Sequence, residues 1–348
     1  MNILIVSNMY PSVEKKYSGL FVLNQFNELK SQLNSNEDID FFYMKRTMTN
    51  FLGSVIKYML FFVKFPFFVL DKRKKYDIVH VHYYYPTIYI ALLYKFIFNS
   101  EVKIIVTFHG ADVDFTKKTI FYKLPLKYID LAIGVSDNLS KKISSFYKGE
   151  VLTISAGIMN DFKPEKRFKS LANREYDLLY VGSFYKADKG FDILIKILKN
   201  IELQLNICFI GSGDQEYLIN QIKSFHKITK INDLCQSEII KYYYNSRYLI
   251  NTSRMESFGL VIAESMSCGT PVIATKTDGS LQQIKNRGNG FFIPTENTLE
   301  QTKIIQEKLK ISEVNYKEMS LNGIKDAAKY KLSNITNQLV SIYKTINS

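Results

Sequence analysis

Cysteine and histidine are scarce in this sequence, and one long segment has almost no acidic side chains. The 348 residues include three cysteines and four histidines. Cys208, Cys235 and Cys268 show no CxxC spacing and are too few for a disulfide framework. His80 and His82 would face the same side of one strand, but the sequence offers no third metal ligand beside them. We therefore expect free thiols in a reducing compartment, no metal site and no cofactor.

The first residues, MNILIVSNMYP, form a short apolar run with no basic stretch before it. A secretory signal has a basic region ahead of its apolar core, so this run is typical of a strand instead. Nothing later in the sequence indicates export. We therefore expect the protein in the cytoplasm.

Acidic residues almost vanish between positions 41 and 75, where Asp71 is the only one. The middle of this segment, FLGSVIKYMLFFVKFPFFVL (51–70), is mostly aromatic and aliphatic. A basic, aromatic-rich helix suits an anionic membrane surface. The basic residues of the segment are Lys45, Arg46, Lys57, Lys64, Lys72, Arg73, Lys74 and Lys75.

Three other interpretations of this segment compete with the membrane surface. It is long enough for a transmembrane span, but Lys57, Lys64 and Pro66 disfavour one. It is also typical of an amphipathic helix packed on a sheet with its lysines in water, and this alternative stays open. Nucleic acid is not expected as a partner, because no nucleic-acid-binding motif accompanies the charge.

Apolar strands alternate with helix-length segments along the chain, which predicts an α/β fold with doubly wound parallel sheets. A charged segment with Pro164 (163–177) interrupts the pattern and is typical of a linker. We expect an N-terminal domain (1–165), a C-terminal domain (166–329) and a last helix (330–348) that packs on either. Expected strands are 2–7, 38–44, 77–82, 102–109, 131–136, 151–155, 176–183, 203–211, 248–253, 270–275 and 290–295.

The stretch SRMESFGLVIAESMSCGTPVIAT (253–275) places Glu256 before a turn and Glu264 inside an apolar run. The turn Ser257–Gly259 precedes a helix that begins near Leu260, and free amides at a helix start bind anions such as a diphosphate. A buried carboxylate needs a partner, and the two hydroxyls of a ribose would serve Glu264. The alternative is a half-exposed glutamate that favours the positive end of its helix.

Other strand ends carry polar residues or glycines toward the same edge of each sheet. Gly19 follows the first strand, and Gly211 stands in FIGSGD (209–214) at the end of another; each allows a close backbone approach. Lys186 and Lys189 follow Gly182 in VGSFYKADKG and would neutralise a diphosphate, unless they are simply solvated. His109, in TFHGADVD, is placed to bond a hydroxyl, although a lone histidine is often structural.

ESFGLVIAESMSCGTPVIAT resembles the E-x7-E signature of retaining GT-B glycosyltransferases of family 4. The resemblance covers nearly the whole chain and is more specific in its C-terminal half. It implies the GT-B fold, in which two Rossmann-like domains face each other across a cleft. Further matching stretches, in the family's order, are GLFVLNQFNEL, YDIVHVH, TFHGADV, VGSF…KGFDILI, FIGSGD and DGSLQQI…GNGFFI.

The resemblance implies a role for each matching residue. Glu256 would contact the transferred sugar, Glu264 the nucleotide ribose, and His109 the sugar and the acceptor side. Backbone amides after Ser257, with Lys189 and Gly19, would hold the diphosphate. The candidate catalytic residues are Glu256 and His109, and the candidate donor-binding residues are Gly19, Gly182, Ser183, Lys186, Lys189, Gly211, Ser257, Phe258, Gly259, Leu260 and Glu264.

The sequence departs from the family pattern at three places. Ser18-Gly19 replaces the usual Gly-Gly, Gly182-Ser183 replaces Gly-Arg, and Gln282 stands where a glutamate is common. Lys186 is the residue that would substitute for the missing arginine.

The resemblance implies a retaining, metal-independent hexosyltransferase that uses a nucleotide-sugar donor, with UDP preferred over GDP. The basic aromatic segment indicates a lipid-linked glycan acceptor, as in the assembly of cell-surface polysaccharide. We therefore expect the enzyme at the inner face of the plasma membrane. Two alternatives remain, a nucleotide-sugar epimerase on the same fold and a non-catalytic module that binds a sugar or nucleotide.

Overall fold

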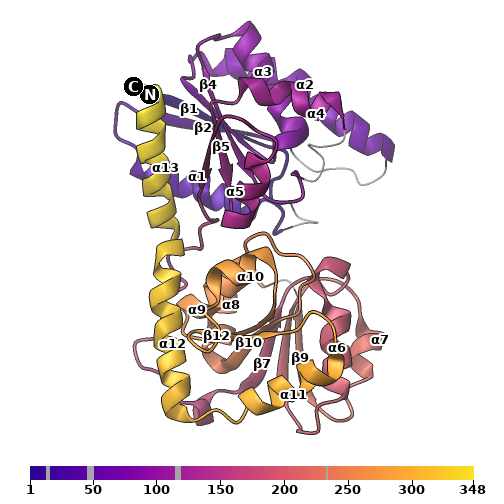
Figure 1. Ribbon diagram of the computed structural model, residues 1–348. Coiled ribbons are helices and arrows are strands. Elements are labelled where there is room, and N and C mark those ends of the chain that lie inside the picture. The colour runs from indigo at the N-terminus through magenta and orange to yellow at the C-terminus, as the bar shows by residue number, and fades with distance from the viewer. Residues whose placement is uncertain (13–15, 45–50, 114–118, 233) are drawn as a thin grey trace. The chain divides into compact units, whose positions relative to one another are not determined.

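The computed structural model describes residues 1–12, 16–44, 51–113, 119–232 and 234–348, and divides into two compact units. The first unit comprises Met1–Gly157 and Leu332–Ser348, and the second comprises Ile158–Lys331. Each unit holds one six-stranded parallel sheet between helices (Figure 1). Lys45 and Arg46 of the basic segment lie outside the described residues.

The first sheet has the strand order β2-β1-β3-β4-β5-β6, with all pairs parallel. Its strands are β1 (Asn2–Ser7), β2 (Asp38–Tyr43), β3 (Ile78–His82), β4 (Lys103–Phe108), β5 (Leu131–Gly134) and β6 (Glu150–Thr153). The helices of this unit are α1 (Leu20–Gln32), α2 (Phe51–Lys72), α3 (Tyr84–Ile97), α4 (Ile120–Lys123), η1 (Leu124–Tyr128), α5 (Asp137–Ser144) and α13 (Leu332–Asn347).

Continuous apolar runs explain this sheet, because its central strands are covered on both faces. Ile3, Leu4, Ile5 and Val6 are at most 1% exposed. Helices α1 and α13 pack together on one face, while α2, α3 and α4 cover the other (Figure 1). The last helix therefore returns to the first unit, where Tyr343 lies in the core.

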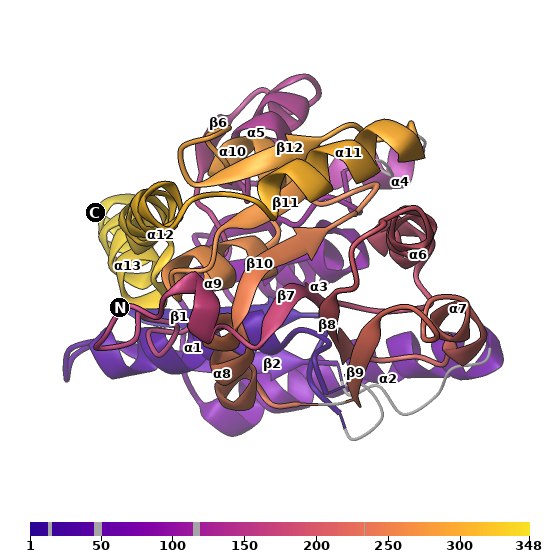
Figure 2. The same cartoon turned by 90° about the horizontal axis from the view of Figure 1, so that it is seen from below.

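The second sheet has the order β12-β11-β10-β7-β8-β9, which Figure 2 shows from below. Its strands are β7 (Tyr176–Val181), β8 (Asn206–Gly211), β9 (Lys227–Asn232), β10 (Ser246–Asn251), β11 (Val272–Thr275) and β12 (Gly290–Ile293). The helices are η2 (Leu171–Asn173), η3 (Ala187–Lys189), α6 (Phe191–Lys199), α7 (Glu216–Asn220), α8 (Gln236–Asn245), α9 (Leu260–Ser267), α10 (Asp278–Gln283), α11 (Thr298–Lys308), α12 (Glu313–Ala327) and η4 (Ala328–Tyr330).

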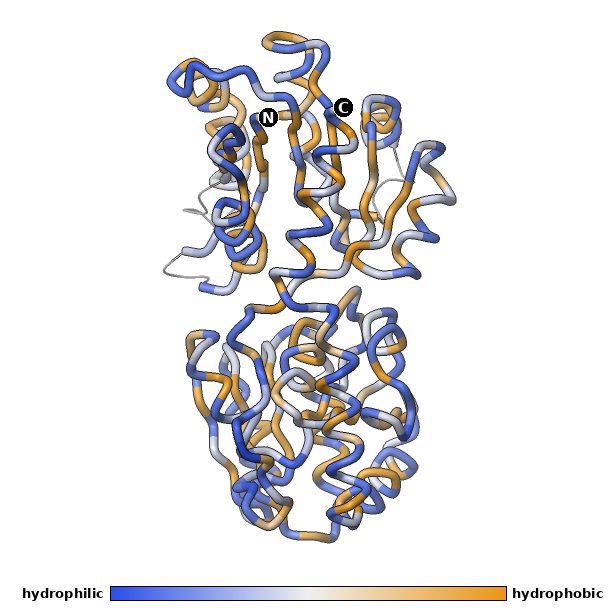
Figure 3. The backbone as a smooth tube through the Cα atoms, turned by 90° about the vertical axis from the view of Figure 1, so that its left-hand side faces the viewer, coloured by the Kyte–Doolittle hydropathy of each residue, from blue (hydrophilic) through white to orange (hydrophobic). Residues whose placement is uncertain are grey.

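Helices α8, α9 and α12 lie on one face of this sheet, and α6, α7 and α11 lie on the other (Figure 2). Hydrophobic and hydrophilic stretches alternate along both units (Figure 3). The strand order reverses direction at β7, where the chain enters the sheet, so the loops after β7 and β10 emerge side by side. In an open parallel sheet this switch point is where ligands bind.

The second unit departs from the expected elements. Strand β9 (Lys227–Asn232) was not among the expected strands, and the helix before it, α7, is only five residues long (Glu216–Asn220). The segment 163–177, interpreted as a linker, packs against the second unit: Arg174 is buried and donates to the carbonyl oxygens of Ser246 and Gly269.

Candidate functional site

Helix α9 begins at Leu260 with Gly259 as its N-cap, in the left-handed conformation at φ 83°. Glycine provides no side chain to cap the helix, so the first amides of α9 have no side-chain acceptor at this position. The preceding residue, Phe258, is buried against Tyr330, and its carbonyl oxygen accepts a hydrogen bond from Gln283. These contacts hold the backbone at this helix start, where the first amides lack intrahelical partners and suit an anion.

The carboxylate of Glu256 lies just ahead of this helix and forms an ion pair with Lys189. The Lys189 Nζ and Glu256 Oε2 atoms are 2.7 Å apart, and the side chains are 28% and 16% exposed. Both charges are partly shielded from water, which strengthens the pair beyond a surface ion pair. The structure thus brings together two predicted site residues that are 67 positions apart.

Further bonds join the loop after β10 to the loop after β7 and to the start of α6. The guanidinium of Arg254 donates to both carboxylate oxygens of Asp192, at 2.8 and 2.7 Å, and to the carbonyl oxygen of Ala187 at 2.6 Å. The hydroxyl of Thr252 donates to the carbonyl oxygen of Gly190 at 2.8 Å. These contacts fix the positions of Lys189 and Glu256 relative to each other.

Gly190 is essential to this junction, and we expect Gly190→Ala to destabilise the protein by at least about 3 kcal/mol. Its φ is +64°, and a Cβ atom would lie 1.9 Å from the carbonyl oxygen of Thr252. Thermal unfolding measures the loss. Gly323→Ala is the matched control, because its Cβ would find ordinary contacts at 3.5 Å or more and alanine favours a helix. Equal melting temperatures for the two variants would contradict the prediction.

Glu264, on α9, is buried at 5% exposure. Its Oε2 atom accepts a hydrogen bond of 2.9 Å from the hydroxyl of Tyr243 on α8. Burial raises the pKa of Glu264 to about 7, and the hydrogen bonds from Tyr243 and Gln236 oppose this rise in part. Further hydrogen-bond donors would stabilise the ionised form of a carboxylate that is this poorly solvated.

The remaining candidates of the second unit lie at the ends of β7 and β8. The amide of Gly182 donates to the carbonyl oxygen of Ile210 at 2.9 Å, and a Cβ on Gly211 would lie 1.7 Å from the Gly182 carbonyl oxygen. Among the described residues, the buried hydroxyl oxygen of Ser183 has no hydrogen-bond partner. Lys186 is exposed on the same loop. Gly182, Ser183 and Lys186 therefore lie on the same loop as Lys189, and Gly211 packs against the start of that loop.

The first unit carries His109 at the end of β4. Its Nε2 atom lies 3.1 Å from Nδ1 of His82, and its ring packs on Phe21 and Tyr83 at centroid distances of 4.9 and 4.4 Å. Burial, with His82 adding to it, holds the pKa of His109 well below its usual value. His109 is therefore a neutral imidazole at pH 7, able to donate or accept one hydrogen bond at each ring nitrogen.

Gly19 caps α1 at φ 72°, and a Cβ there would lie 2.7 Å from the backbone of Met9. Phe21, two residues later, contacts the ring of His109, so the structure brings the predicted Gly19 loop and His109 to one region of the first unit. The amides of His109 and Gly110 both donate to Asp112 Oδ1 at 3.0 Å. Asp112 thereby fixes the turn that presents His109.

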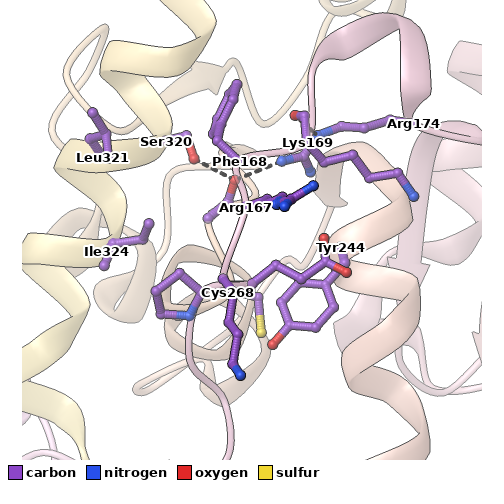
Figure 4. Close-up of a pocket in the computed structure, with 13 residues that line it drawn as sticks. Arg167, Phe168, Lys169, Arg174, Tyr244, Cys268, Ser320, Leu321 and Ile324 are labelled. Carbon is purple, nitrogen blue, oxygen red and sulfur yellow. Dashed lines mark hydrogen bonds between the residues drawn. The ribbon is translucent and has the colours of Figure 1, made fainter.

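A separate cavity of about 320 Å³ lies in the second unit (Figure 4). It is lined by Arg167, Arg174, Tyr244 and Cys268 among others. Cys268 follows the carboxyl end of α9, whereas Glu256 precedes its amino end. The cavity is therefore at the end of α9 opposite to the candidate site, and the guanidinium of Arg174 beside it donates to backbone carbonyl oxygens.

Sequence reasoning missed Tyr243, Arg254 and Asp112 as positioning residues. Arg254 stands two residues before Glu256, and a cation so close to a candidate carboxylate was the available signal. Tyr243 lies within a run of three tyrosines, and no spacing rule identifies which of them faces Glu264.

Two family models match consecutive parts of the chain. "Glycosyltransferase Family 4" covers residues 39–158, and "Glycosyl transferases group 1" covers residues 162–326. The boundary between the two matches falls near the division between the two units.

Curated relatives share about a quarter of the sequence. An uncharacterized glycosyltransferase of Methanocaldococcus jannaschii is 26% identical over 280 residues, covering 78% of this chain and 76% of the relative. An N-acetyl-alpha-D-glucosaminyl L-malate synthase of Bacillus anthracis is 25% identical, covering 65% and 64%. A capsular polysaccharide biosynthesis glycosyltransferase of Staphylococcus aureus is 27% identical, covering 61% of each chain.

Solved structures share the architecture over the whole chain. Sucrose-phosphate synthase from Thermosynechococcus elongatus has a TM-score of 0.81 at 18% identity and covers 99% of both chains. HepE of Anabaena, solved in complex with UDP-glucose, has a TM-score of 0.72 at 16% identity and covers 99% of this chain and 100% of its own. Two six-stranded parallel sheets with flanking helices, in the same arrangement within each unit, make this a GT-B fold, and with the two family matches the chain belongs to the group 1, family 4 glycosyltransferases.

Proposed function

We propose that this protein transfers a sugar from a UDP-sugar to a glycan acceptor with retention of anomeric configuration. The observation that carries the proposal is the ion pair of Lys189 and Glu256 at the amino end of α9. A cation and a helix start that offers free amides suit the diphosphate of a nucleotide sugar. A carboxylate beside them suits the positive charge that develops on the sugar.

In the proposed step the bond between the anomeric carbon and the diphosphate oxygen breaks, and UDP leaves with the electron pair. The acceptor hydroxyl attacks from the same face and passes its proton to the departing diphosphate. Lys189 and the amides of α9 stabilise the charge that gathers on the leaving group. These groups supply the neutralisation that a divalent cation gives in other enzymes, so we expect transfer to proceed without added metal.

Glu264 would hold the ribose of the donor, since the two vicinal hydroxyls of a ribose match a buried carboxylate that needs donors. UDP is favoured over GDP because HepE, of the same fold, was solved with UDP-glucose. The acceptor is proposed to be a lipid-linked glycan in cell-surface polysaccharide assembly, at the cytoplasmic face of the membrane. A capsular polysaccharide enzyme among the relatives supports this acceptor, while an L-malate synthase among them is the contrasting case.

The test is a thermal-shift screen of the purified chain against UDP-, GDP- and CMP-sugars. Ligand at 100 times its Kd raises the unfolding free energy by about 2.7 kcal/mol. We expect UDP-sugars to give the largest increase in melting temperature. No shift with any nucleotide would overturn the proposal. Conversion of a UDP-sugar without an acceptor would indicate an epimerase, and binding without turnover would indicate a non-catalytic module.

A further inference from the structure

The outward face of α2 is apolar, although its inward face already fills the core. Phe61, Phe65 and Val69 are at most 5% exposed, and the rings of Phe42 and Phe61 stack at 4.9 Å. The outward side chains repeat at helical spacing and are between 44% and 69% exposed: Val55, Met59, Leu60, Val63, Phe67 and Leu70. A helix packed on a sheet in water normally turns polar residues outward. The outward face of α2 is instead an exposed apolar surface, which is typical of an interaction site.

Helices α3 and α4 extend this apolar face. The rings of Phe65 and Tyr94 join α2 to α3 at 6.4 Å, and the hydroxyl of Tyr89 on α3 donates to the carbonyl oxygen of Phe121 at 2.8 Å. Five exposed side chains continue the surface, between 53% and 71% exposed: Phe96, Ile97, Ile120, Phe121 and Leu124. We call these five and the six of α2 the α2–α4 surface. Figure 1 shows the three helices together on one side of the first sheet.

The elements of the α2–α4 surface carry many cations and almost no acids. Residues 51–75, 84–98 and 119–129 contain one acid, Asp71. They contain nine basic residues: Lys57, Lys64, Lys72, Arg73, Lys74, Lys75, Lys95, Lys123 and Lys127. Of these, Lys64, Arg73, Lys75, Lys123 and Lys127 are exposed.

Two lysines of the basic segment have a structural role instead. Lys72 pairs with Asp40 at 2.8 Å, and Lys74 pairs with Asp38 and Asp40. The sequence alone therefore overstates the charge that the end of α2 offers to a partner, and Arg73 and Lys75 are the exposed cations there.

We propose that the α2–α4 surface docks the protein on an anionic lipid bilayer, with its apolar side chains in the interface and its cations on lipid phosphates. An apolar face bordered by lysine and arginine is what such a surface binds. Within the described residues, α2 is long and apolar enough to cross a membrane, but its inward face is packed in the core of the first unit. The helix therefore lies on the bilayer and does not span it.

Charge decides between a bilayer and a second copy of this chain. Two copies that met through this surface would bring like charges together, which disfavours association. An anionic bilayer is complementary to the same charges. The inference relies on the proposed function only for the lipid-linked acceptor, because docking itself needs no donor.

The test measures co-sedimentation of the full chain with vesicles of phosphatidylcholine alone or with phosphatidylglycerol, at low and high salt. We expect binding to the anionic vesicles and a loss of about tenfold or more in Met59→Glu/Phe67→Glu. The matched control is Leu299→Glu/Val314→Glu, which changes side chains that are 73% and 76% exposed in the second unit. The control should bind like the parent.

Three outcomes would overturn the proposal. The α2 variant could bind vesicles as well as the parent, the parent could ignore anionic vesicles at low salt, or the parent could elute as a dimer that the α2 variant alone disrupts. The thermal shift with UDP, measured on every variant, distinguishes a failure of the membrane proposal from a failure of the proposed function. The increase in melting temperature with UDP should match that of the parent in both double variants. Met59 and Phe67 are exposed, and they are far in sequence from the nucleotide loops.

Discussion

Replacing Glu256 with glutamine is expected to lower the rate constant of sugar transfer by about 10²–10³-fold, while nucleotide affinity stays within a few-fold of the parent. As the bond to the diphosphate breaks, positive charge develops on the sugar, and a carboxylate beside it stabilises that charge. Glutamine keeps the size and shape of the side chain, removes its charge, and replaces one acceptor oxygen with an amide donor. Steady-state kinetics with a saturating donor and direct binding of UDP measure the two quantities separately.

The ion pair with Lys189 predicts different effects of the two partners on nucleotide affinity. Loss of the carboxylate leaves the Lys189 ammonium, which is 2.7 Å away in the parent, with its charge available to the diphosphate. Nucleotide affinity should therefore not fall, whereas Lys189→Ala should weaken it. Glu296→Gln, at an exposed position of the same unit, is the matched control and should transfer at the parent rate. Parent-like transfer by Glu256→Gln would remove this carboxylate from the mechanism.

The sheets could be predicted from the sequence because burial on both faces leaves a local signal. Continuous apolar runs such as Ile3–Val6 marked most strands to within a few residues. Strand β9 was missed, because it is an edge strand whose lysines and half-exposed residues give no apolar run. The glycine at 259 likewise indicated the start of α9, since glycine adopts the left-handed conformation without the steric cost of a side chain.

Contacts between distant positions could not be predicted in the same way. Nothing local in the sequence shows that Lys189 meets Glu256, that Tyr243 meets Glu264, or that Lys74 meets Asp38. The structure also bears on the competing interpretations of the basic aromatic segment. One of them was an amphipathic helix with its lysines in water and its apolar residues packed on the sheet. This interpretation fits only the inward face of α2, because the outward positions are apolar as well.

Glu264 has the second large expected effect, on the pH dependence of both stability and nucleotide binding. Its pKa is about 7 in the folded protein, above the usual value of a glutamic acid. The folded state therefore holds a proton that the unfolded state releases, and stability falls as pH rises from about 4.5 to 7. By linkage this loss amounts to about 3 kcal/mol above pH 8.

Glutamine at position 264 cannot ionise, so Glu264→Gln should remove this pH dependence. We expect the variant to be more stable than the parent at pH 8 and similar to it at pH 4.5, as measured by urea unfolding at both values. Glu300→Gln, on the exposed side of α11, is the control and should follow the parent. A parent whose stability does not change with pH in this window would contradict the raised pKa.

Nucleotide binding should show the opposite trend, because ribose hydroxyls donate to the ionised carboxylate. Donation lowers the pKa of Glu264 on binding, so UDP should bind more tightly as pH rises through 7, with release of a proton. Isothermal titration in buffers of different ionisation enthalpy counts that proton. Tyr243→Phe removes one donor from the carboxylate, which raises its pKa further and should move the affinity profile to higher pH. Glu264→Gln should bind UDP about tenfold or more weakly and without proton release, since a buried acceptor has lost its charge. Equal profiles in the three proteins would mean that the ribose is held elsewhere.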